Sequence, residues 1–438
     1  MAIVVRHACL LDLDRRSVQA GELSIRGATI AAAGPRVEVA DGDEVLDACG
    51  AVVMPGLVNG HTHLYSALAT GMPPPAGAPH GLHEILDAVW WRLDRALDLP
   101  LCEISALIGG LEALHCGTTT VIDHHASPAA IDGSLDTIEA GLRIAGLRGI
   151  LGYETTDRNG PDDCRAGLAE NERYLRHCLA RQNGWFAAMV GVHAAFTLSD
   201  ASLAAVADLA ARHQVGVHIH VAEDPCDDAI CRQCYGAGVV DRLTRAGVFD
   251  LPSLLAHGTH LTRSDWDRLT DSAITLAHNP RSNMNNAVGY TPLGHVRRPV
   301  VLGTDGIGSD MLAELATAWY KSRDGGAGLS PDALVDMLAE SARLAGRLLG
   351  VRLGTLVPGA AADLVVTDYV PTTPLDADNL AGHLIFGLGA RHTRSVMVGG
   401  QWRLRDRSWT GGDESELRRR ATTEARRLWD LMQAEPRP

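Results

Sequence analysis

Several side chains that can bind a metal ion follow short apolar runs in this 438-residue chain. Neutral imidazole and carboxylate groups are ligands for zinc and iron in proteins. Four apolar runs end in such groups: AVVMPGLVNG at His61 and His63, VGVHIH at His220, SLLA at His257 and VVLGT at Asp305. These residue types predict a metal site.

The spacing of residues in two of these runs indicates how their side chains are arranged. His61 and His63 are two positions apart on an expected strand, so their side chains point to the same side. An isolated His-x-His pair is weak evidence, because such pairs also occur in protein cores and on surfaces. Glu223 lies three residues after His220, just beyond the expected strand. A carboxylate there can serve as acid and base beside an ion, or it can be an ordinary salt-bridged loop acid.

Eight apolar runs with polar ends predict eight buried strands. In chain order they end at His61-Thr62-His63, Asp123-His124-His125, Glu154, His193, His220, His257, His278-Asn279 and Asp305. Helical patterns alternate with them from Pro55 to about Gly350, which indicates βα units and a parallel sheet. Chemistry confined to the carboxyl ends of eight strands is typical of an α/β enzyme with a (β/α)8 TIM barrel.

The terminal segments differ from this pattern. Residues 1–55 and 355–406 alternate apolar and polar positions between turns, which predicts one small discontinuous β-sandwich domain built from both termini. Residues 56–354 form the predicted barrel, and 407–438 an Arg-rich C-terminal helix whose arginines face solvent or pair with acids. The Pro/Gly-rich loop 71–81 either covers the active site or is a plain surface loop.

The composition argues against two classes of binding partner. Lys and Arg total 39 against 53 Asp and Glu, a formal charge of −14, so we expect neither nucleic acid nor an anionic membrane as partner. The N-terminus lacks the features of a signal peptide, and the nine cysteines favour reduced thiols and a cytoplasmic location. The spacing of Cys226, Cys231 and Cys234 suggests a zinc knuckle, but a second C-x-x-C is missing, and we expect free thiols.

Four motifs, in order, resemble those of the amidohydrolase superfamily. PGLVNGHTH, HVAE, LAHGTH and GTDG are similar to its first-, fifth-, sixth- and eighth-strand signatures. Within the superfamily the chain resembles the deaminases and chlorohydrolases of cyclic amidines and heterocycles. CGTTTVIDHHASP and NPRSNMNNAVG look most like the SsnA-type aminohydrolases.

The resemblance implies a site with named roles. One divalent ion, zinc or alternatively iron, would be bound by His61, His63, His220 and Asp305. Glu223 would shuttle a proton, His257 would orient the water or polarise the substrate, and Asp305 would also accept the water's proton. Two-metal members bridge their ions with a carboxylated lysine from the fourth strand. The expected fourth strand, FAAMVGVHAA, contains no lysine, and the chain has a single one, at position 321, which favours one metal per subunit.

Substrate contacts are less specifically indicated. The resemblance implies that His193 contacts substrate. His125, Glu154 and Asn279 are further candidates with alternatives: His125 as support behind the pocket, Glu154 as the buried partner of an arginine, Asn279 as the residue that shapes its loop. Trp90 and Trp91 are adjacent on an expected helix and cannot share a face, so one is expected in the core and the other is a candidate pocket wall.

These expectations define a function. The resemblance implies a metal-dependent hydrolase, a deaminase that releases ammonia from a purine, pyrimidine or related cyclic amidine. One alternative is hydrolysis of another C–N or C–Cl bond on the same fold, by a dechlorinase or cyclic amidase. A catalytically silent barrel with a binding role is a second, which the complete ligand set disfavours. We expect a small heterocyclic substrate and a homodimer or larger homo-oligomer.

Overall fold

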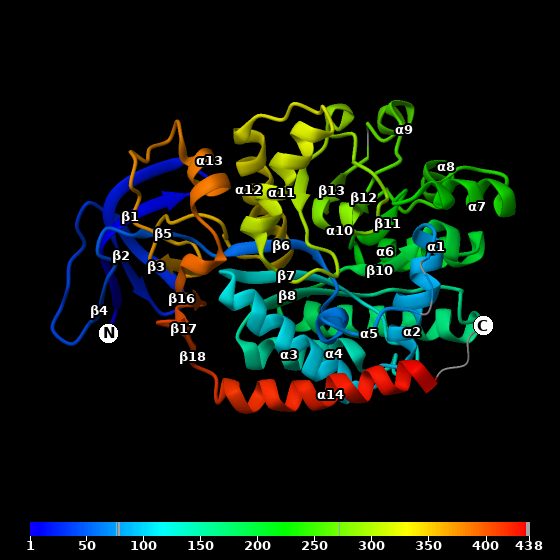
Figure 1. The fold of residues 1–438 in the computed structure, drawn as a ribbon, viewed down its shortest axis with the longest axis horizontal. Coiled ribbons are helices and arrows are strands. Elements are labelled where there is room, and N and C mark those ends of the chain that lie inside the picture. The colour runs from blue at the N-terminus through cyan, green and yellow to red at the C-terminus, as the bar shows by residue number, and fades with distance from the viewer. Residues whose placement is uncertain (76, 78, 271, 435–438) are drawn as a thin grey trace.

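The computed structural model describes residues 1–75, 77, 79–270 and 272–434. A β/α barrel occupies one half of the molecule and a separate sheet the other, with a long C-terminal helix along one side (Figure 1). The predicted fold class is confirmed.

The barrel wall consists of parallel strands in two hydrogen-bonded groups. The first group is β6 (Leu57–Thr62), β7 (Thr118–His125), β8 (Arg148–Tyr153) and β9 (Phe186–Ala188); the second is β10 (Val190–Ala194), β11 (Val217–Val221), β12 (Ser253–His257), β13 (Ile274–His278) and β14 (Val300–Leu302). Isolated parallel bridges join the groups, Thr155 to Val192 on one side and Thr62 to Asp305 on the other. The wall is therefore closed.

The predicted fourth strand is interrupted. β9 pairs with β8, and β10 pairs with β11, with Met189 between them. Met189 is buried in a cluster with side chains from the other barrel strands, including Val58, Ile150, Leu254 and Val301. The change of pairing partner at Met189 explains why one continuous apolar run forms two strands.

Helices cover the barrel from outside (Figure 1). They are α3 (Leu99–His115), α4 (Ser134–Ala145), α5 (Pro161–Arg181), α6 (Asp200–His213), α7 (Pro225–Tyr235), α8 (Val239–Arg245), α9 (Arg263–Arg268), α10 (Pro280–Asn285), α11 (Met311–Asp324) and α12 (Pro331–Leu349). After β6 the chain also forms four short elements near the barrel mouth: η1 (Leu64–Ala69), α1 (Leu82–Ile85), the π-helical η2 (Leu86–Trp90) and α2 (Trp91–Arg95).

Both ends of the chain contribute to the second sheet. Its strands are β1 (Ile3–Asp12), β2 (Ser17–Arg26), β3 (Thr29–Gly34), β4 (Glu44–Asp47), β5 (Val52–Pro55), β15 (Leu364–Thr367), β16 (Thr393–Val398), β17 (Gln401–Arg405) and β18 (Ser408–Trp409). Their order is β18-β17-β16-β15-β5-β1-β2-β3, with β4 beside β1. Side chains from both termini, including Val5, Leu23, Val53, Leu364 and Met397, form one core cluster.

One predicted run, AVVMPGLVNG, divides between the two sheets. β5 belongs to the terminal sheet and β6 to the barrel, with Gly56 between them. A Cβ at Gly56 would lie 2.3 Å from the Thr119 side chain. Glycine is therefore required where the chain passes from one sheet to the other.

The C-terminal helix α14 (Glu414–Ala434) begins later than the predicted segment 407–438, because Ser408–Trp409 pair with β17 as a strand; residues 435–438 lie outside the described part. Its buried side chains face the barrel helices, and Arg427 forms a bidentate pair with Asp98 at 2.7 and 3.0 Å.

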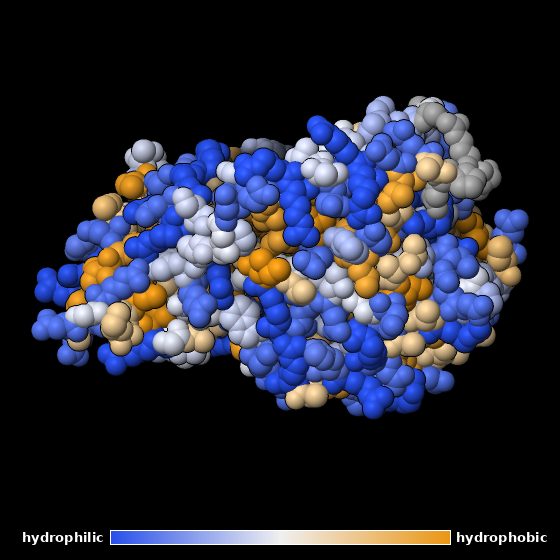
Figure 2. All heavy atoms as spheres, turned by 90° about the horizontal axis from the view of Figure 1, so that it is seen from below, coloured by the Kyte–Doolittle hydropathy of each residue, from blue (hydrophilic) through white to orange (hydrophobic). Residues whose placement is uncertain are grey.

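The face of the molecule seen from below is largely hydrophilic, with scattered apolar residues (Figure 2). Within the described chain, each helix is too short or too polar to cross a bilayer.

The predicted loop 71–81 falls partly outside the description, at residues 76 and 78. Within its described part, Met72 to Pro75 line a surface cavity together with Trp429 and Met432 of α14. The residues that reach over the barrel mouth come instead from α1, η2 and α2, which follow the loop.

A buried ion pair links the barrel to the terminal sheet. Arg148 begins β8 and Asp363 precedes β15; their side chains are 3% and 4% exposed and form two hydrogen bonds of 2.8 and 2.9 Å. Asp363 also accepts from the backbone N–H of Gly399 at 2.8 Å. The pair therefore crosses the boundary between the two parts.

We expect Asp363→Ala to lower the free energy of unfolding by about 3–5 kcal/mol, because it leaves the Arg148 guanidinium buried without its counter-charge. Chemical denaturation measures the change. Glu416→Ala, which removes an exposed pair with Arg419 on α14, is the control and should change stability by less than about 1 kcal/mol. Equal effects of the two substitutions would contradict a structural role for the buried pair.

Candidate metal centre and active site

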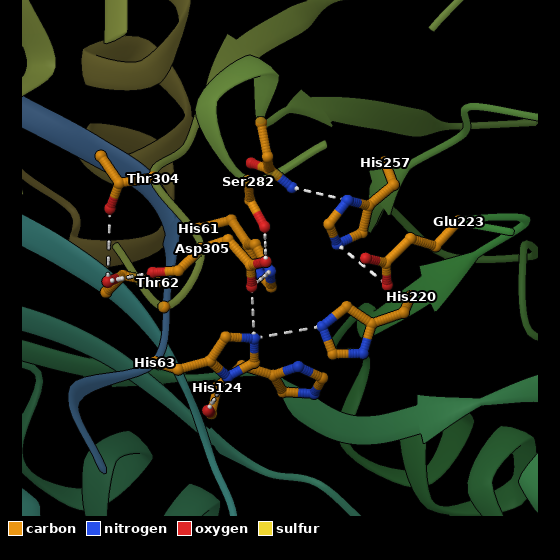
Figure 3. A network of polar contacts seen from close by, with 12 residues as sticks. His61, Thr62, His63, His124, His220, Glu223, His257, Ser282, Thr304 and Asp305 are labelled. Carbon is orange, nitrogen blue, oxygen red and sulfur yellow. Dashed lines mark hydrogen bonds and ion pairs between the residues drawn. The ribbon is translucent and has the colours of Figure 1, made fainter. Parts of the chain in front are cut away.

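Three imidazole nitrogens and one carboxylate oxygen converge at the barrel mouth (Figure 3). Asp305 Oδ1 lies 2.8 Å from His63 Nε2 and 3.3 Å from His61 Nε2, and His63 Nε2 lies 3.2 Å from His220 Nε2. The ligand atoms of His61, His220 and Asp305 all lie within 4.8 Å of one another. The structure thus brings together the four residues predicted as metal ligands.

Their positions follow from the closure of the barrel. His61 lies at the end of β6 and His63 directly follows that strand, His220 lies in β11, and Asp305 follows β14. Where β6 meets the chain after β14, the N–H of Asp305 donates to the His61 carbonyl at 3.0 Å and the N–H of His63 donates to the Asp305 carbonyl at 3.3 Å. Backbone hydrogen bonds therefore fix three of the candidate ligands, His61, His63 and Asp305, against one another.

The opposite nitrogen of each imidazole is occupied. His61 Nδ1 lies 2.8 Å from His218 Nε2, and His220 Nδ1 lies 2.9 Å from the His193 carbonyl oxygen. His63 Nδ1 lies 2.6 Å from the carbonyl oxygen of His124 and 3.0 Å from Glu154 Oε1. Contacts of this kind orient metal-binding histidines and set which ring nitrogen is free. All three rings direct Nε2 toward the same point.

The burial and bonding of these groups fit a divalent cation. The His61 side chain is fully buried, and its Nε2 makes no hydrogen bond to any described residue. Burial lowers the pKa of His61 to about 4 and that of His220 well below its usual range, which favours neutral rings. At His63 burial is outweighed by the contacts with Asp305 and Glu154, which raise its pKa well above the usual range, so a cation would have to displace a proton from that ring. Three nitrogens and one oxygen are a donor set that suits zinc or iron.

The backbone is strained at two of the predicted positions. His257 has φ 72° and Asp305 has φ 55°, in the left-handed region that non-glycine residues rarely adopt. Such conformations cost about 1–3 kcal/mol each and gather at functional sites. The strain is consistent with a catalytic role for both residues.

Glu223 and His257 lie beside the converging groups. His257 Nε2 is 3.5 Å from Glu223 Oε2, and His257 Nδ1 is 2.8 Å from Asn283 Oδ1. The Glu223 N–H donates to Asp227 Oδ2 at 3.0 Å, and burial raises the pKa of the Glu223 carboxyl. A raised pKa makes a carboxyl group a better proton donor than its ionised form and fits an acid and base role.

A cavity opens over these groups, and its lining separates the predicted substrate contacts. Among the described residues His193 and Glu154 line it, whereas His125 and Asn279 do not. His125 Nε2 contacts Ser127 Oγ at 2.9 Å, and the Asn279 side chain lies 3.5 Å from His257 Nδ1. Both side chains therefore lie outside the cavity lining: His125 lies behind it, as its alternative stated, and the Asn279 side chain contacts His257 rather than the backbone of its own loop. Glu154 pairs with His63 rather than with an arginine.

Other lining residues were not predicted. Both Trp90 and Trp91 line the cavity and are only half-buried, so the prediction that one of them lies in the core is wrong. The further lining residues include Tyr65, Ser66, Leu82, Leu86, Asp94, Phe196, Asp227, Ser282 and Asn286. Tyr65 could have been suspected from its place two residues after His63. Asp94 lies on α2, which carries no recognisable pattern.

Comparison with known proteins adds to this geometry. Residues 52–403 match the model of the amidohydrolase family. A 5-methylthioadenosine/S-adenosylhomocysteine deaminase of Pelotomaculum thermopropionicum is 32% identical over 97% of this chain and 98% of its own.

Solved structures share the fold. An adenosine deaminase of Xanthomonas campestris with bound zinc superposes with a TM-score of 0.84 at 23% identity, covering 97% of this chain and 98% of that one. An atrazine chlorohydrolase of Arthrobacter aurescens complexed with zinc superposes with a TM-score of 0.79 at 21% identity, covering 97% of this chain and 100% of that one.

We expect His61→Ala to abolish stoichiometric metal binding, because it removes one of four converging donors. Elemental analysis of the purified variant measures this. His125→Ala is a matched control, since it deletes a buried imidazole that lies outside the convergence. Full metal content in His61→Ala would exclude His61 as a ligand.

We further expect His218→Ala to retain the metal but bind it about 10–100-fold more weakly, because the His61 ring loses the contact that orients it. Competition with a chromophoric chelator gives the affinity. An unchanged affinity would show that the 2.8 Å contact has no part in metal binding.

Proposed function

The chain belongs to the amidohydrolase family, and we propose that it is a deaminase that hydrolyses the exocyclic C–N bond of an adenine-type ring. The observation that carries this proposal is the convergence of three imidazole Nε2 atoms and Asp305 Oδ1 beside Glu223. The relative at 32% identity is named for 5-methylthioadenosine and S-adenosylhomocysteine, so adenine nucleosides are the first substrates to consider.

We assign His61, His63, His220 and Asp305 to one metal ion per subunit, and zinc is supported by the zinc in two structures of the same fold. A divalent cation bound there would lower the pKa of water from about 15.7 to about 7 and so supply hydroxide near neutral pH. A homodimer or larger assembly stays a prediction.

The side chains divide the remaining chemistry. Asp305 accepts the proton that the water loses, and Ser282 holds its second oxygen, Oδ2, by a hydrogen bond. Glu223 donates a proton to the ring nitrogen next to the reacting carbon, which allows this carbon to become tetrahedral. His257, held by Asn283, directs its Nε2 toward Glu223 and can orient the incoming water.

Collapse of the tetrahedral carbon breaks the C–N bond. The amino group takes up the proton held by Asp305 and leaves as ammonia. The hydroxyl group that came from the water gives its proton to the Glu223 carboxylate and becomes the ring carbonyl, which restores both acids to their starting state. The same residues could expel chloride from a ring carbon, the reaction for which the chlorohydrolase is named. The convergence of His61, His63, His220 and Asp305 argues against a catalytically silent barrel with a binding role.

Product analysis separates these reactions. We expect the zinc-loaded protein to release ammonia from adenosine or 5′-substituted adenosines in a screen that includes purines, pyrimidines, pterins and triazines. Coupled ammonia detection and a chloride assay on chlorinated triazines measure the two outcomes. Chloride release without ammonia release would reassign the activity.

Glu223→Gln should keep its zinc and lower kcat by about 10²–10⁴-fold, because the amide cannot donate the required proton. Steady-state kinetics and elemental analysis on the same preparation test both parts. Glu172→Gln, which alters a partly exposed acid that pairs with His213, is the control. A variant at Glu223 with wild-type kcat would assign the proton transfer elsewhere.

A further inference from the structure

One short helix, α10, contacts several of the groups that the proposed chemistry uses. Its residue Ser282 is directed at Asp305 (Figure 3), and its residue Asn283 contacts His257. The residue that ends this helix, Asn286, takes no part in the chemistry proposed above. Its side chain is nevertheless buried, at 8% exposure, and it lines the cavity.

The Asn286 amide lies between the two acids of the site. Its Nδ2 is 3.5 Å from Glu223 Oε1 and 3.4 Å from Ser282 Oγ, and the Ser282 hydroxyl in turn donates to Asp305 Oδ2. The Asn286 Oδ1 atom accepts from Asn285 Nδ2 at 3.1 Å, which directs the amino group rather than the oxygen toward the acids. A chain of hydrogen bonds therefore joins Glu223 to Asp305.

The orientation of the Glu223 carboxylate depends on such contacts. Glu223 lies beyond the end of β11, and the last torsion of a glutamate side chain is broad. In the described part of the chain, His257 Nε2 contacts Oε2 and Asn286 Nδ2 contacts Oε1, each at 3.5 Å. Because the two contacts reach different oxygens, together they set the plane of the carboxylate. Both are long for hydrogen bonds, and catalytic contacts of this kind shorten when substrate fills a site.

α10 itself is held in place by a buried acid. The backbone N–H and the Nε of Arg281 both donate to the carboxylate of Glu314 on α11, which is fully buried. Arg281 Nη2 also donates to the Ile307 carbonyl at 3.0 Å, two residues after Asp305. The helix is therefore fixed both to α11 and to the loop that carries Asp305, so that it forms a firm support for the side chains it presents to the site.

We propose that Asn286 is a positioning residue, which orients the Glu223 carboxylate relative to Asp305 by donating its amide N–H groups to Glu223 and to Ser282. Proton delivery to the ring nitrogen and proton removal from the water then occur in one fixed geometry. This inference rests on the proposed deaminase function, in which Glu223 is the proton donor. Asn286 acts through Glu223, and substrate and metal are bound by other groups.

Asn286→Ala should lower kcat for adenosine about 10–100-fold, because a misplacement of about 1 Å can cost about 10²-fold in rate. KM should change by less than about 3-fold, because the lost interaction serves the transition state rather than substrate binding. Ammonia release and elemental analysis on one zinc-loaded preparation measure kcat, KM and metal content, which should stay full. Asn286→Asp keeps the size but removes the amide donor, should lose at least as much, and carries the test should the alanine variant fail to fold.

A double-mutant cycle shows whether Asn286 acts through Glu223. In the Glu223→Gln background, the further change Asn286→Ala should alter kcat by less than about 3-fold, because the donor that it positions is already absent. Met284→Ala is the matched control, since Met284 lies on the same helix and is 51% exposed. It should keep the wild-type kcat. The unfolding midpoint is measured for each variant.

The outcomes separate this proposal from the deaminase function. Wild-type kcat in both Asn286 variants would overturn the positioning role and leave the function intact, and so would an equal loss with and without Glu223. A raised KM at unchanged kcat would assign Asn286 to substrate binding and would also overturn the positioning role. A wild-type enzyme that releases no ammonia from adenosine would overturn both proposals.

Discussion

The site depends on the contact between the first and last barrel strands. There the backbones of His61, His63 and Asp305 exchange hydrogen bonds, so that ligands more than 240 positions apart in the chain are fixed by main-chain geometry rather than by flexible side chains. Side-chain bonds reinforce the same seam: Asn59 Nδ2 donates to Thr304 Oγ1 at 2.7 Å. A metal site whose donors sit on a closed hydrogen-bonded wall is organised before any ion arrives.

The imidazoles form a connected network rather than three independent ligands. His218 contacts His61, the His193 carbonyl contacts His220, and Glu154 contacts His63. Each of these supporting residues comes from a different strand or strand end. The orientation of each candidate ligand ring therefore depends on how the neighbouring strand packs. His193 and Glu154 also line the cavity. The cavity lining and the candidate ligands are therefore connected through the Glu154 side chain and the His193 backbone, an arrangement that orients ligand rings.

The four candidate ligands can be proposed from the sequence because they follow a local rule. A buried apolar strand that ends in a polar residue at the barrel mouth can be recognised from a single run, and His61, His63, His220 and Asp305 all fit that rule. Asp94 does not, because α2 reaches the cavity only through tertiary packing. The same limit explains the interrupted strand at Met189 and the later start of α14, where pairing with a neighbouring strand decided the local structure.

Gly56 has a consequence for how the two parts of the molecule can change. One residue separates the last N-terminal strand of the outer sheet from the first strand of the barrel, and the side chain of Thr119 fills the space that any larger residue would need. The outer sheet is therefore coupled to the site. A deletion or insertion at this junction would shift the register of β6 and turn His61 and His63 together away from His220 and Asp305. Exchange of the outer sheet between relatives is compatible with activity only if the single-glycine connection survives unaltered.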